Sequence, residues 1–392
     1  LTGGTTNLTI DGSDIALALS NNNLTIGGTG GPLTLTINSN ITGSGLLRIW
    51  DGDDDLTVIL GGTNSMVRAT GGVGNTAAPV SVRVESGDTV SIAADAALGS
   101  GKLSLNDGTL AVTGATTIDN EIHLDNLIST INNSADVTIS GAINGSGGLI
   151  KTGASTLTLT GTNTYQDTTT ITNGTLSVSG DSNLGNSNNA IIFNGGNLTV
   201  TGTTTIDNTV TLTSNATITN SADVTLSGVI SSTGNLTKAG ANTLTLSGVN
   251  TYTGTTTVTD GTLSVSADNR LGTGALTLNG GNLAVTGATT IDNTITLSSN
   301  ATVTNSADVT LSGVISGGNN LTKAGASTLT LSADNTYTGT TTVTDGTLAV
   351  SADSKLGTGA LTLNGGNLTV TGATTIDNTV TLSANATVTN SA

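Results

Sequence analysis

Residues 236–265 read LTKAGANTLTLSGVNTYTGTTTVTDGTLSV, and the pattern of this stretch predicts the fold. Within its runs Leu and Val alternate with Thr and Ser, as in a β-strand with one face buried and the other in water. The stretch returns at residues 321–350 and, more loosely, at residues 149–178. The copies belong to a longer repeat, because residues 238–307 and 323–392 match at 61 positions in a constant register that aligns Lys238 with Lys323. A tandem repeat of this length predicts one elongated body of stacked units.

A shorter period lies inside the repeat. Alternating runs begin at Leu244, Leu263, Leu283 and Ala301, roughly 20 residues apart. Four coils of about 21 residues, one of them with an insertion, would account for one repeat. In a parallel β-solenoid each coil stacks its strands about 4.8 Å from those of the previous coil. We therefore predict an all-β chain, a parallel β-solenoid of about 18–19 coils of ~21 residues, with interior ladders of Leu, Val and Ile.

We expect one continuous solenoid over residues 1–392. Its parts are a divergent repeat copy at residues 1–98, a partial copy at 99–150, and tandem repeats at 151–237, 238–322 and 323–392, the last one incomplete. The divergent copy is inferred from GSGLLRIWDGDDDLTVILGG at 43–62, which resembles GSGGLIKTGASTLTLTG at 145–161 when a one-residue gap places Arg48 over Lys151. Because the sequence stops inside a repeat, we interpret it as a piece of a longer chain.

Composition narrows the class of partner. The formal net charge is −17, so the clustered positive charge that nucleic acids require is missing and no nucleic-acid partner is expected. No run approaches the roughly 20 apolar residues that span a bilayer, so we expect no membrane insertion by this segment. There is no cysteine, which leaves no disulfide and no thiolate metal site.

The segment at 236–265 closely resembles the autotransporter-associated β-strand repeat, also called the passenger-associated transport repeat. The resemblance rests on the Leu-Thr-Lys-Ala-Gly opening, Thr-Leu-Thr-Leu-Ser, Asn-Thr-Tyr-Thr-Gly and Gly-Thr-Leu, and it returns at 321–350 and 149–178. It implies a secreted right-handed parallel β-helix, exported across a bacterial outer membrane and displayed at the cell surface. Passengers of this kind have adhesive, enzymatic or purely structural roles.

From the repeats and this resemblance we predict a non-enzymatic extracellular rod with a structural or adhesive role. Its expected partners are further copies of itself, joined end to end as a fibre, and a glycan or protein on a host or neighbouring cell. Two alternatives stay open: a polysaccharide-active β-helix enzyme and a glycan-binding adhesin.

One cluster of aspartates could bind a metal ion or take part in catalysis. Asp51, Asp53, Asp54 and Asp55 could hold Ca²⁺ or serve a glycosidase as paired acids, since oxygen ligands and carboxylate pairs suit those roles. The spacing is not that of an EF-hand, and a solvated turn is the commoner role of such a cluster. We therefore predict no catalytic residue and no cofactor, with Ca²⁺ at these aspartates as the open alternative.

Tyrosine and lysine recur at equivalent positions of the repeat. Tyr165, Tyr252 and Tyr337 are candidate ligand contacts, although packing at a corner is the simpler role. The equivalent lysines are predicted to be solvated charges at turns: Lys151, Lys238 and Lys323.

Two further patterns were weighed for function. His123 is the single histidine, and because it replaces an outward-facing threonine we expect a surface side chain without a catalytic role. The Thr255-Thr256-Thr257 triplet could order water if it lay on one face at every coil. It recurs once per repeat, so we expect other residues on the intervening coils and no such array.

Overall fold

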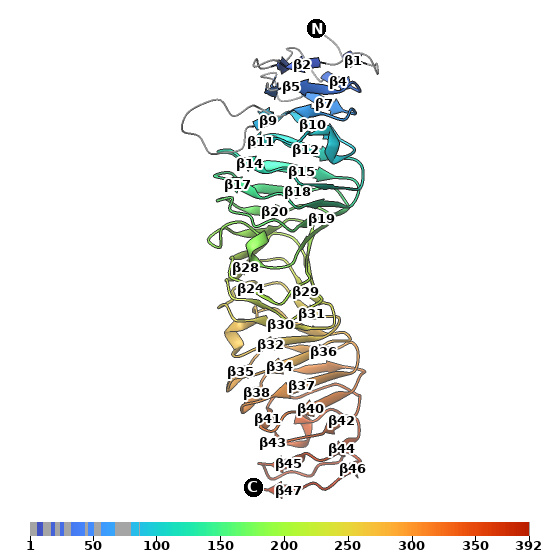
Figure 1. The fold of residues 1–392 in the computed structure, drawn as a ribbon. Helices are drawn as coiled ribbons and strands as arrows, with labels where there is room; N and C mark the ends of the chain where they lie inside the picture. Colours follow the sequence, from blue (N-terminus) through green and yellow to red (C-terminus); the bar gives the residue numbers. More distant parts are fainter. Residues whose placement is uncertain are drawn as a thin grey trace. The chain divides into compact units, whose positions relative to one another are not determined.

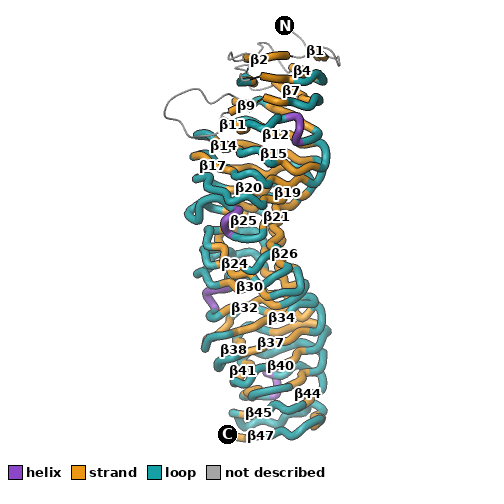
Figure 2. Tube along the Cα trace, in the orientation of Figure 1, coloured by secondary structure: helices purple, strands orange, loops and turns teal. Residues whose placement is uncertain are grey.

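The fold is described from a computed structural model. It describes residues 6–10, 17–19, 24–26, 33–43, 46–50, 56–66, 80–85 and 87–391. The chain divides into two compact units, residues 1–198 and 199–392, and each is described by itself. Short strands joined by turns make up both units. In the described part of the chain the helical segments are four 3-10 turns of three residues, drawn in purple in Figure 2.

The first unit consists of parallel sheets whose neighbouring strands come from successive coils. Its β1 sheet contains, in order, β1 (Thr6–Ile10), β4 (Leu33–Ile37), β7 (Leu56–Leu60), β10 (Thr89–Ile92), β12 (Thr109–Val112), β15 (Ser129–Asn133), β18 (Leu149–Thr152), β20 (Thr169–Ile171) and β22 (Ile191–Phe193). Its β3 sheet contains β3 (Leu24–Ile26), β6 (Leu47–Ile49), β9 (Val80–Glu85), β11 (Lys102–Asn106), β14 (Ile122–Leu124) and β17 (Ile143–Gly145). Its β13 sheet contains β13 (Thr116–Ile118), β16 (Val137–Ile139), β19 (Thr156–Leu159) and β21 (Thr175–Val178), and a small sheet contains β2 (Leu17–Leu19), β5 (Ile41–Gly43) and β8 (Ser65–Met66).

The second unit repeats this design. Its β24 sheet contains β24 (Thr204–Ile206), β27 (Val224–Leu226), β30 (Thr243–Leu246), β32 (Thr262–Val265), β34 (Asn282–Val285), β37 (Ala301–Asn305), β40 (Leu321–Ala324), β42 (Thr341–Val343), β44 (Leu361–Leu363) and β46 (Val380–Leu382). Its β26 sheet contains β26 (Ala216–Asn220), β29 (Leu236–Ala239), β31 (Thr256–Val258), β33 (Leu276–Leu278), β36 (Ile295–Leu297) and β39 (Ile315–Gly317). Its β35 sheet contains β35 (Thr289–Ile291), β38 (Val309–Leu311), β41 (Thr328–Leu331), β43 (Thr347–Val350), β45 (Asn367–Val370) and β47 (Val388–Asn390), and β25 (Val210–Leu212) pairs with β28 (Ile230–Ser232).

These pairings confirm the predicted β-solenoid. Thr217 pairs with Thr237 and Thr237 with Thr257, so each coil returns to the same face after about 20 residues. The described residues form about 17 turns of about 20 residues, slightly fewer and shorter than the 18–19 coils of ~21 that we predicted. Figure 1 shows the stacking within the second unit, where β32, β34, β37 and β40 lie one after another. Continuity of the solenoid over residues 1–392 remains a prediction.

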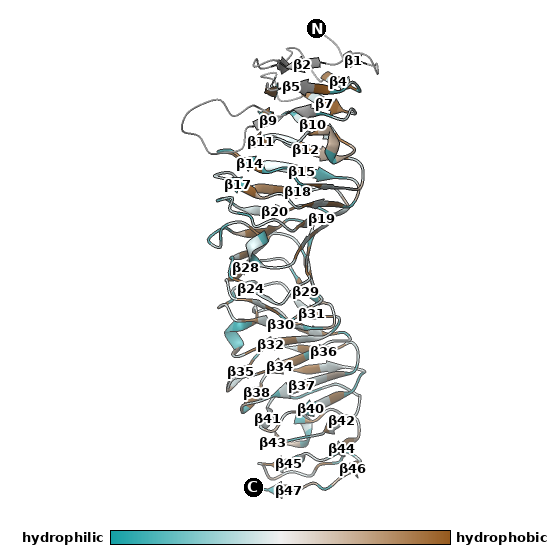
Figure 3. Cartoon of the chain, viewed as in Figure 1, coloured by the Kyte–Doolittle hydropathy of each residue, from teal (hydrophilic) through white to brown (hydrophobic). Residues whose placement is uncertain are grey.

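Strand burial follows the alternation in the sequence. In β30, Leu244 and Leu246 are fully buried, whereas Thr243 and Thr245 point outward. Parallel in-register pairing then places leucine above leucine, as with Leu244 and Leu263, and builds the interior ladder. Figure 3 shows the hydrophobic colour concentrated on strands such as β18 and β34.

The repeat does not contain a whole number of coils. We compare the length of four coils with the length of one repeat. On the β26 sheet four coils extend from Thr217 to Thr296, which is 79 positions, whereas one repeat extends from Lys238 to Lys323, which is 85 positions. The repeat is therefore longer than four coils by six positions, close to a third of a coil. Equivalent residues of successive copies lie on different sheets: Lys238 lies on β29 of the β26 sheet and Lys323 on β40 of the β24 sheet. The predicted block of four coils with an insertion is wrong, because the extra residues advance the chain by one face.

Where a coil has no strand on one face, an asparagine side chain makes the hydrogen bonds to the neighbouring coils that a strand backbone would make. Between β30 and β31 the chain crosses one face as a loop, and Asn250 lies buried in it. The Ile230 N–H donates to Asn250 Oδ1 (2.8 Å), while Asn250 Nδ2 donates to the Arg270 carbonyl oxygen (2.5 Å). One amide thus joins the coils before and after it. Equivalent bonds are made by Asn163, Asn335 and, in the divergent copy, Asn64.

Candidate binding surface

The predicted acidic cluster and the recurring tyrosines have different outcomes. Asp51, Asp53, Asp54 and Asp55 lie outside the described residues. Each tyrosine is fully buried, and its hydroxyl lies within hydrogen-bonding distance of the threonine four residues later, as in the Tyr252–Thr256 pair (2.6 Å). Burial raises the pKa of Tyr252, because the phenolate would lose its hydration. A ring without exposed surface cannot contact a ligand in solution, so the geometry supports packing: Tyr165, Tyr252, Tyr337.

The prediction of solvated lysines is wrong. Lys151, Lys238 and Lys323 have no exposed surface, because each follows an inward-facing leucine by two residues on the same strand. The amine of Lys323 donates to the carbonyl oxygens of Ala324 (2.9 Å), Gly325 (2.5 Å) and Asp345 (3.1 Å). Burial lowers the pKa of each lysine from 10.5 to about 8.

The alignment of the divergent copy also needs a correction. Arg48 points outward from β6 between the buried Leu47 and Ile49, whereas Lys151 points inward. The proposed one-residue gap is therefore wrong, and Ile49 is the residue that matches Lys151 in orientation.

Outward side chains of the β3 sheet form a charged network that the sequence did not reveal. Arg48 Nη2 pairs with Glu85 Oε2 (2.7 Å), Arg83 also pairs with Glu85, and Arg83 Nη2 reaches Asp125 Oδ2 (3.0 Å). Burial opposes ionisation of Glu85, but hydrogen bonds from the two arginines outweigh it and lower its pKa below the usual value. At one end the Arg48 guanidinium lies 5.0 Å from the centre of the half-exposed Trp50 ring.

His123 belongs to the same network. Its Nε2 lies 3.1 Å from Asp125 Oδ1 and its Nδ1 lies 2.5 Å from Asn144 Oδ1. Asn144 Nδ2 donates to Glu121 Oε1 (2.6 Å), which fixes the amide so that its oxygen faces the histidine. Both ring nitrogens therefore face oxygen atoms of neighbouring side chains. The side chain is partly exposed, and its partners are Asp125 of the same coil and Asn144 of the next coil.

Threonines of successive coils form columns, contrary to our expectation. Thr257 has a threonine beside it on each neighbouring coil of the β26 sheet. The column contains Thr217, Thr237, Thr257, Thr277 and Thr296. The triplet recurs once per repeat, but its last residue, Thr257, continues a column supplied by other parts of the repeat.

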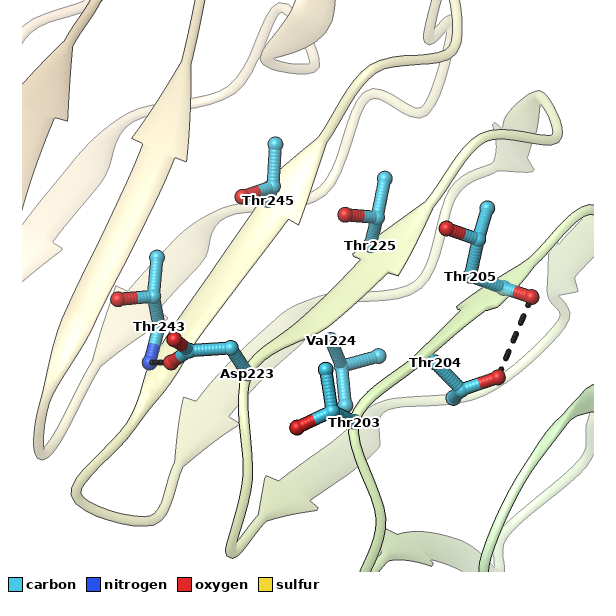
Figure 4. Close-up of a pocket in the computed structure, with 8 residues that line it drawn as sticks. All are labelled: Thr203, Thr204, Thr205, Asp223, Val224, Thr225, Thr243 and Thr245. Atoms are coloured by element: carbon cyan, nitrogen blue, oxygen red, sulfur yellow. Dashed lines mark hydrogen bonds between the residues drawn. The ribbon is translucent and has the colours of Figure 1, made fainter.

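A shallow open groove of about 350 Å³ lies on the first three strands of the β24 sheet. Its lining residues are Thr203, Thr204, Thr205, Asp223, Val224, Thr225, Thr243 and Thr245 (Figure 4). Thr205, Thr225 and Thr245 form one column, since β24 pairs with β27 and β27 with β30. The Thr243 N–H donates to Asp223 Oδ1 (2.9 Å), which holds the carboxylate beside this column. The groove is therefore a regular grid of hydroxyl groups with one carboxylate.

Among the described residues no three His, Asp or Glu side chains gather as a metal site would require. Within the same residues no helix has the length and apolar character to cross a membrane.

Comparison with known proteins identifies the repeat. The family model described as passenger-associated-transport-repeat matches residues 149–178, 236–265, 270–293, 321–350 and 354–378. Three of these regions are the ones from which the resemblance was inferred, and 270–293 and 354–378 are additional. No curated protein and no solved structure matches the chain.

Proposed function

Because the chain carries passenger-associated transport repeats on a β-solenoid, we propose that it is a stiff extracellular segment of a bacterial autotransporter passenger, with a structural or adhesive role and no enzymatic activity. The observation that carries this proposal is that the regions matched by the family model form coils of the β-solenoid. The matched region 236–265 begins at the strand of the buried lysine and ends with β32, so the family motif encodes the coil corner and its internal bonds.

The features copied in each repeat support a scaffold role. The buried lysine, the tyrosine hydroxyl bond and the asparagine that joins three coils are all internal. Outward positions carry mostly Thr and Ser, which suit a strand surface in water. Duplication of a repeat that keeps these internal contacts makes the rod longer and leaves its cross-section unchanged.

Adhesion needs a partner, and we propose two. One is a further copy of the chain, joined end to end as a fibre. The other is a glycan or protein on a neighbouring or host cell. Electron microscopy of the purified chain tests the first, since monodisperse particles at high concentration would exclude a fibre.

Surface display tests the proposal as a whole. The chain is fused to a bacterial translocator barrel and expressed in a non-adherent strain, with an epitope inserted at Ser187 in the exposed turn of residues 186–188. We expect antibody labelling of intact cells and increased attachment to other cells or to coated surfaces. An epitope reached only after lysis would refute an extracellular role.

A further inference from the structure

We propose that the groove formed by Thr203, Thr205, Asp223, Thr225 and Thr245 binds a neutral, unbranched polysaccharide that lies along the stacking direction of the coils. This assignment rests on the proposed surface role and names the class of ligand that the surface would take.

Spacing is the first argument. Thr205, Thr225 and Thr245 pair in register on parallel strands, so their side chains are about 4.8 Å apart. This distance is close to the length of one sugar residue in an extended β-linked polysaccharide. Along each strand the next outward position is about 6.7 Å away. A second column, made of Thr203, Asp223 and Thr243, therefore runs beside the first and gives the groove two polar rows.

Orientation is the second argument. In Figure 4 the hydroxyl oxygens of Thr205, Thr225 and Thr245 point the same way, and their methyl groups share another direction. Each coil thus presents the same pair of groups, a hydroxyl that donates and accepts and a methyl that packs. A pyranose chain likewise presents hydroxyl groups and C–H surfaces at a regular interval. The two periodic surfaces can therefore match over consecutive residues.

Charge selects among polysaccharides. Asp223 is the single charged residue in the lining, and one of its oxygens accepts the Thr243 N–H. The other oxygen can accept from a sugar hydroxyl, a strong type of hydrogen bond because the acceptor is ionised. The carboxylate and the net charge of −17 both repel an acidic polysaccharide. A neutral glycan meets neither penalty.

The lining recurs along the chain. Asp308 accepts the Thr328 N–H (2.8 Å) beside Thr310, as Asp223 does in the groove. In the first unit Asp136 makes the same bond with the Thr156 N–H (2.9 Å). The three sites lie on different sheets, with Asp223 at β27 of the β24 sheet, Asp308 at β38 of the β35 sheet and Asp136 at β16 of the β13 sheet, so each would bind a separate polysaccharide chain.

The test follows threonine methyl signals by NMR during titration with cellohexaose, a neutral β-linked oligosaccharide. We expect shifts concentrated at Thr205, Thr225 and Thr245. Thr225→Val keeps the shape and removes one hydroxyl, so it should weaken binding at the neighbouring methyls by about fivefold, the value of one lost hydrogen bond. Asp223→Asn can still accept the Thr243 N–H and should weaken binding by at least as much.

Thr237→Val is the matched control, because Thr237 is an outward column residue on the β26 sheet. It should leave cellohexaose binding unchanged, and circular dichroism should show the same β-sheet content for all three variants. No methyl shifts with cellohexaose, an equal loss in the control, or stronger binding of an oligogalacturonate would each overturn the assignment. If displayed cells still adhere in any of these cases, the groove assignment fails while the proposed surface role stands.

Discussion

Lysine burial predicts that this protein becomes more stable as the solution turns mildly alkaline. Lys238 is fully buried, and its amine donates to the carbonyl oxygens of Ala239 (3.1 Å) and Gly240 (2.5 Å). Burial lowers its pKa from 10.5 to about 8, although Asp260 and Asp223 partly oppose the change. The perturbation is Lys238→Met, which retains an unbranched apolar side chain and removes the titrating amine.

The sign follows from proton binding. Between about pH 8 and about pH 10.4 the folded lysine has lost its proton while the unfolded one keeps it. The unfolded state then binds more protons, so the free energy of unfolding rises with pH. Below about pH 8 both states are protonated and the dependence disappears. Burial raises the pKa of Tyr252, which favours unfolding above about pH 10, so the useful window ends there.

The magnitude comes from the size of the pKa change. A fall from 10.5 to about 8 corresponds to about 3 kcal/mol for each lysine, at about 1.4 kcal/mol per pH unit. Lys151 and Lys323 show the same fall, so three groups contribute in the wild type. We expect Lys238→Met to lose about a third of the wild-type slope between pH 8 and 10.

Urea unfolding at several pH values, followed by circular dichroism, measures this slope, and NMR of the lysine side chains measures the pKa directly. Lys355→Met is the matched control, because the Lys355 amine pairs with the exposed Asp334 carboxylate (2.7 Å). It should keep the wild-type slope. A wild-type stability that stays flat or falls between pH 8 and 10, or a Lys238→Met slope equal to that of the wild type, would contradict the titration of the buried lysines in this range.

Four further outcomes are expected. Asn250→Ala leaves the Ile230 N–H and the Arg270 carbonyl without partners, which should lower the free energy of unfolding by about 2–5 kcal/mol. Hydrogen exchange at the Ile230 amide should also become faster. The control Asn269→Ala, at an exposed position, should change neither quantity. Tyr337→Phe removes the hydroxyl that lies 2.7 Å from Thr341 Oγ1 and should cost about 1 kcal/mol in thermal unfolding; no cost would mean that the bond is replaced by water. Gly240→Ala should lower the free energy of unfolding by more than about 2 kcal/mol. Gly240 has φ 85°, and a Cβ there would overlap the Asn220 carbonyl oxygen. A variant that melts at the wild-type temperature would contradict this close packing. The free energy of unfolding of the wild type should fall as the pH falls through the lowered pKa of Glu85. Arg83→Gln removes one ion pair of Glu85, so it should raise the pKa of Glu85 and make this fall in stability smaller. NMR of the Glu85 carboxyl group can follow its pKa.

Much of the fold could be predicted from the sequence because it depends on local alternation. The period of two in Leu244-Thr245-Leu246 sets which side chains are inside, and the spacing of such runs sets the coil. The regions at 149–178, 236–265 and 321–350 identify the repeat in the same way, since the motif is continuous along the chain. The predicted role of Asp51 and its neighbours remains untested.

The groove and the charged network depend on residues brought together from different coils. Thr205, Thr225 and Thr245 lie in three different stretches of the chain, and nothing in any one stretch shows that they form a column. Arg48 and Glu85 are 37 residues apart, across a segment that does not follow the regular coil length. A reader of the sequence would need the exact number of residues per coil to align them.

Alternation and spacing are properties of neighbouring residues, so the amino-acid sequence alone specifies that this chain stacks parallel strands in a repeating coil. The inward orientation of Lys151, Lys238 and Lys323, and the start of each new copy on another face, follow from contacts between coils. The lysine carbonyl partners include residues of the next coil, such as Asp345 for Lys323, 22 residues later. The change of face depends on the few residues left over after four coils, a remainder too small to appear in any local pattern.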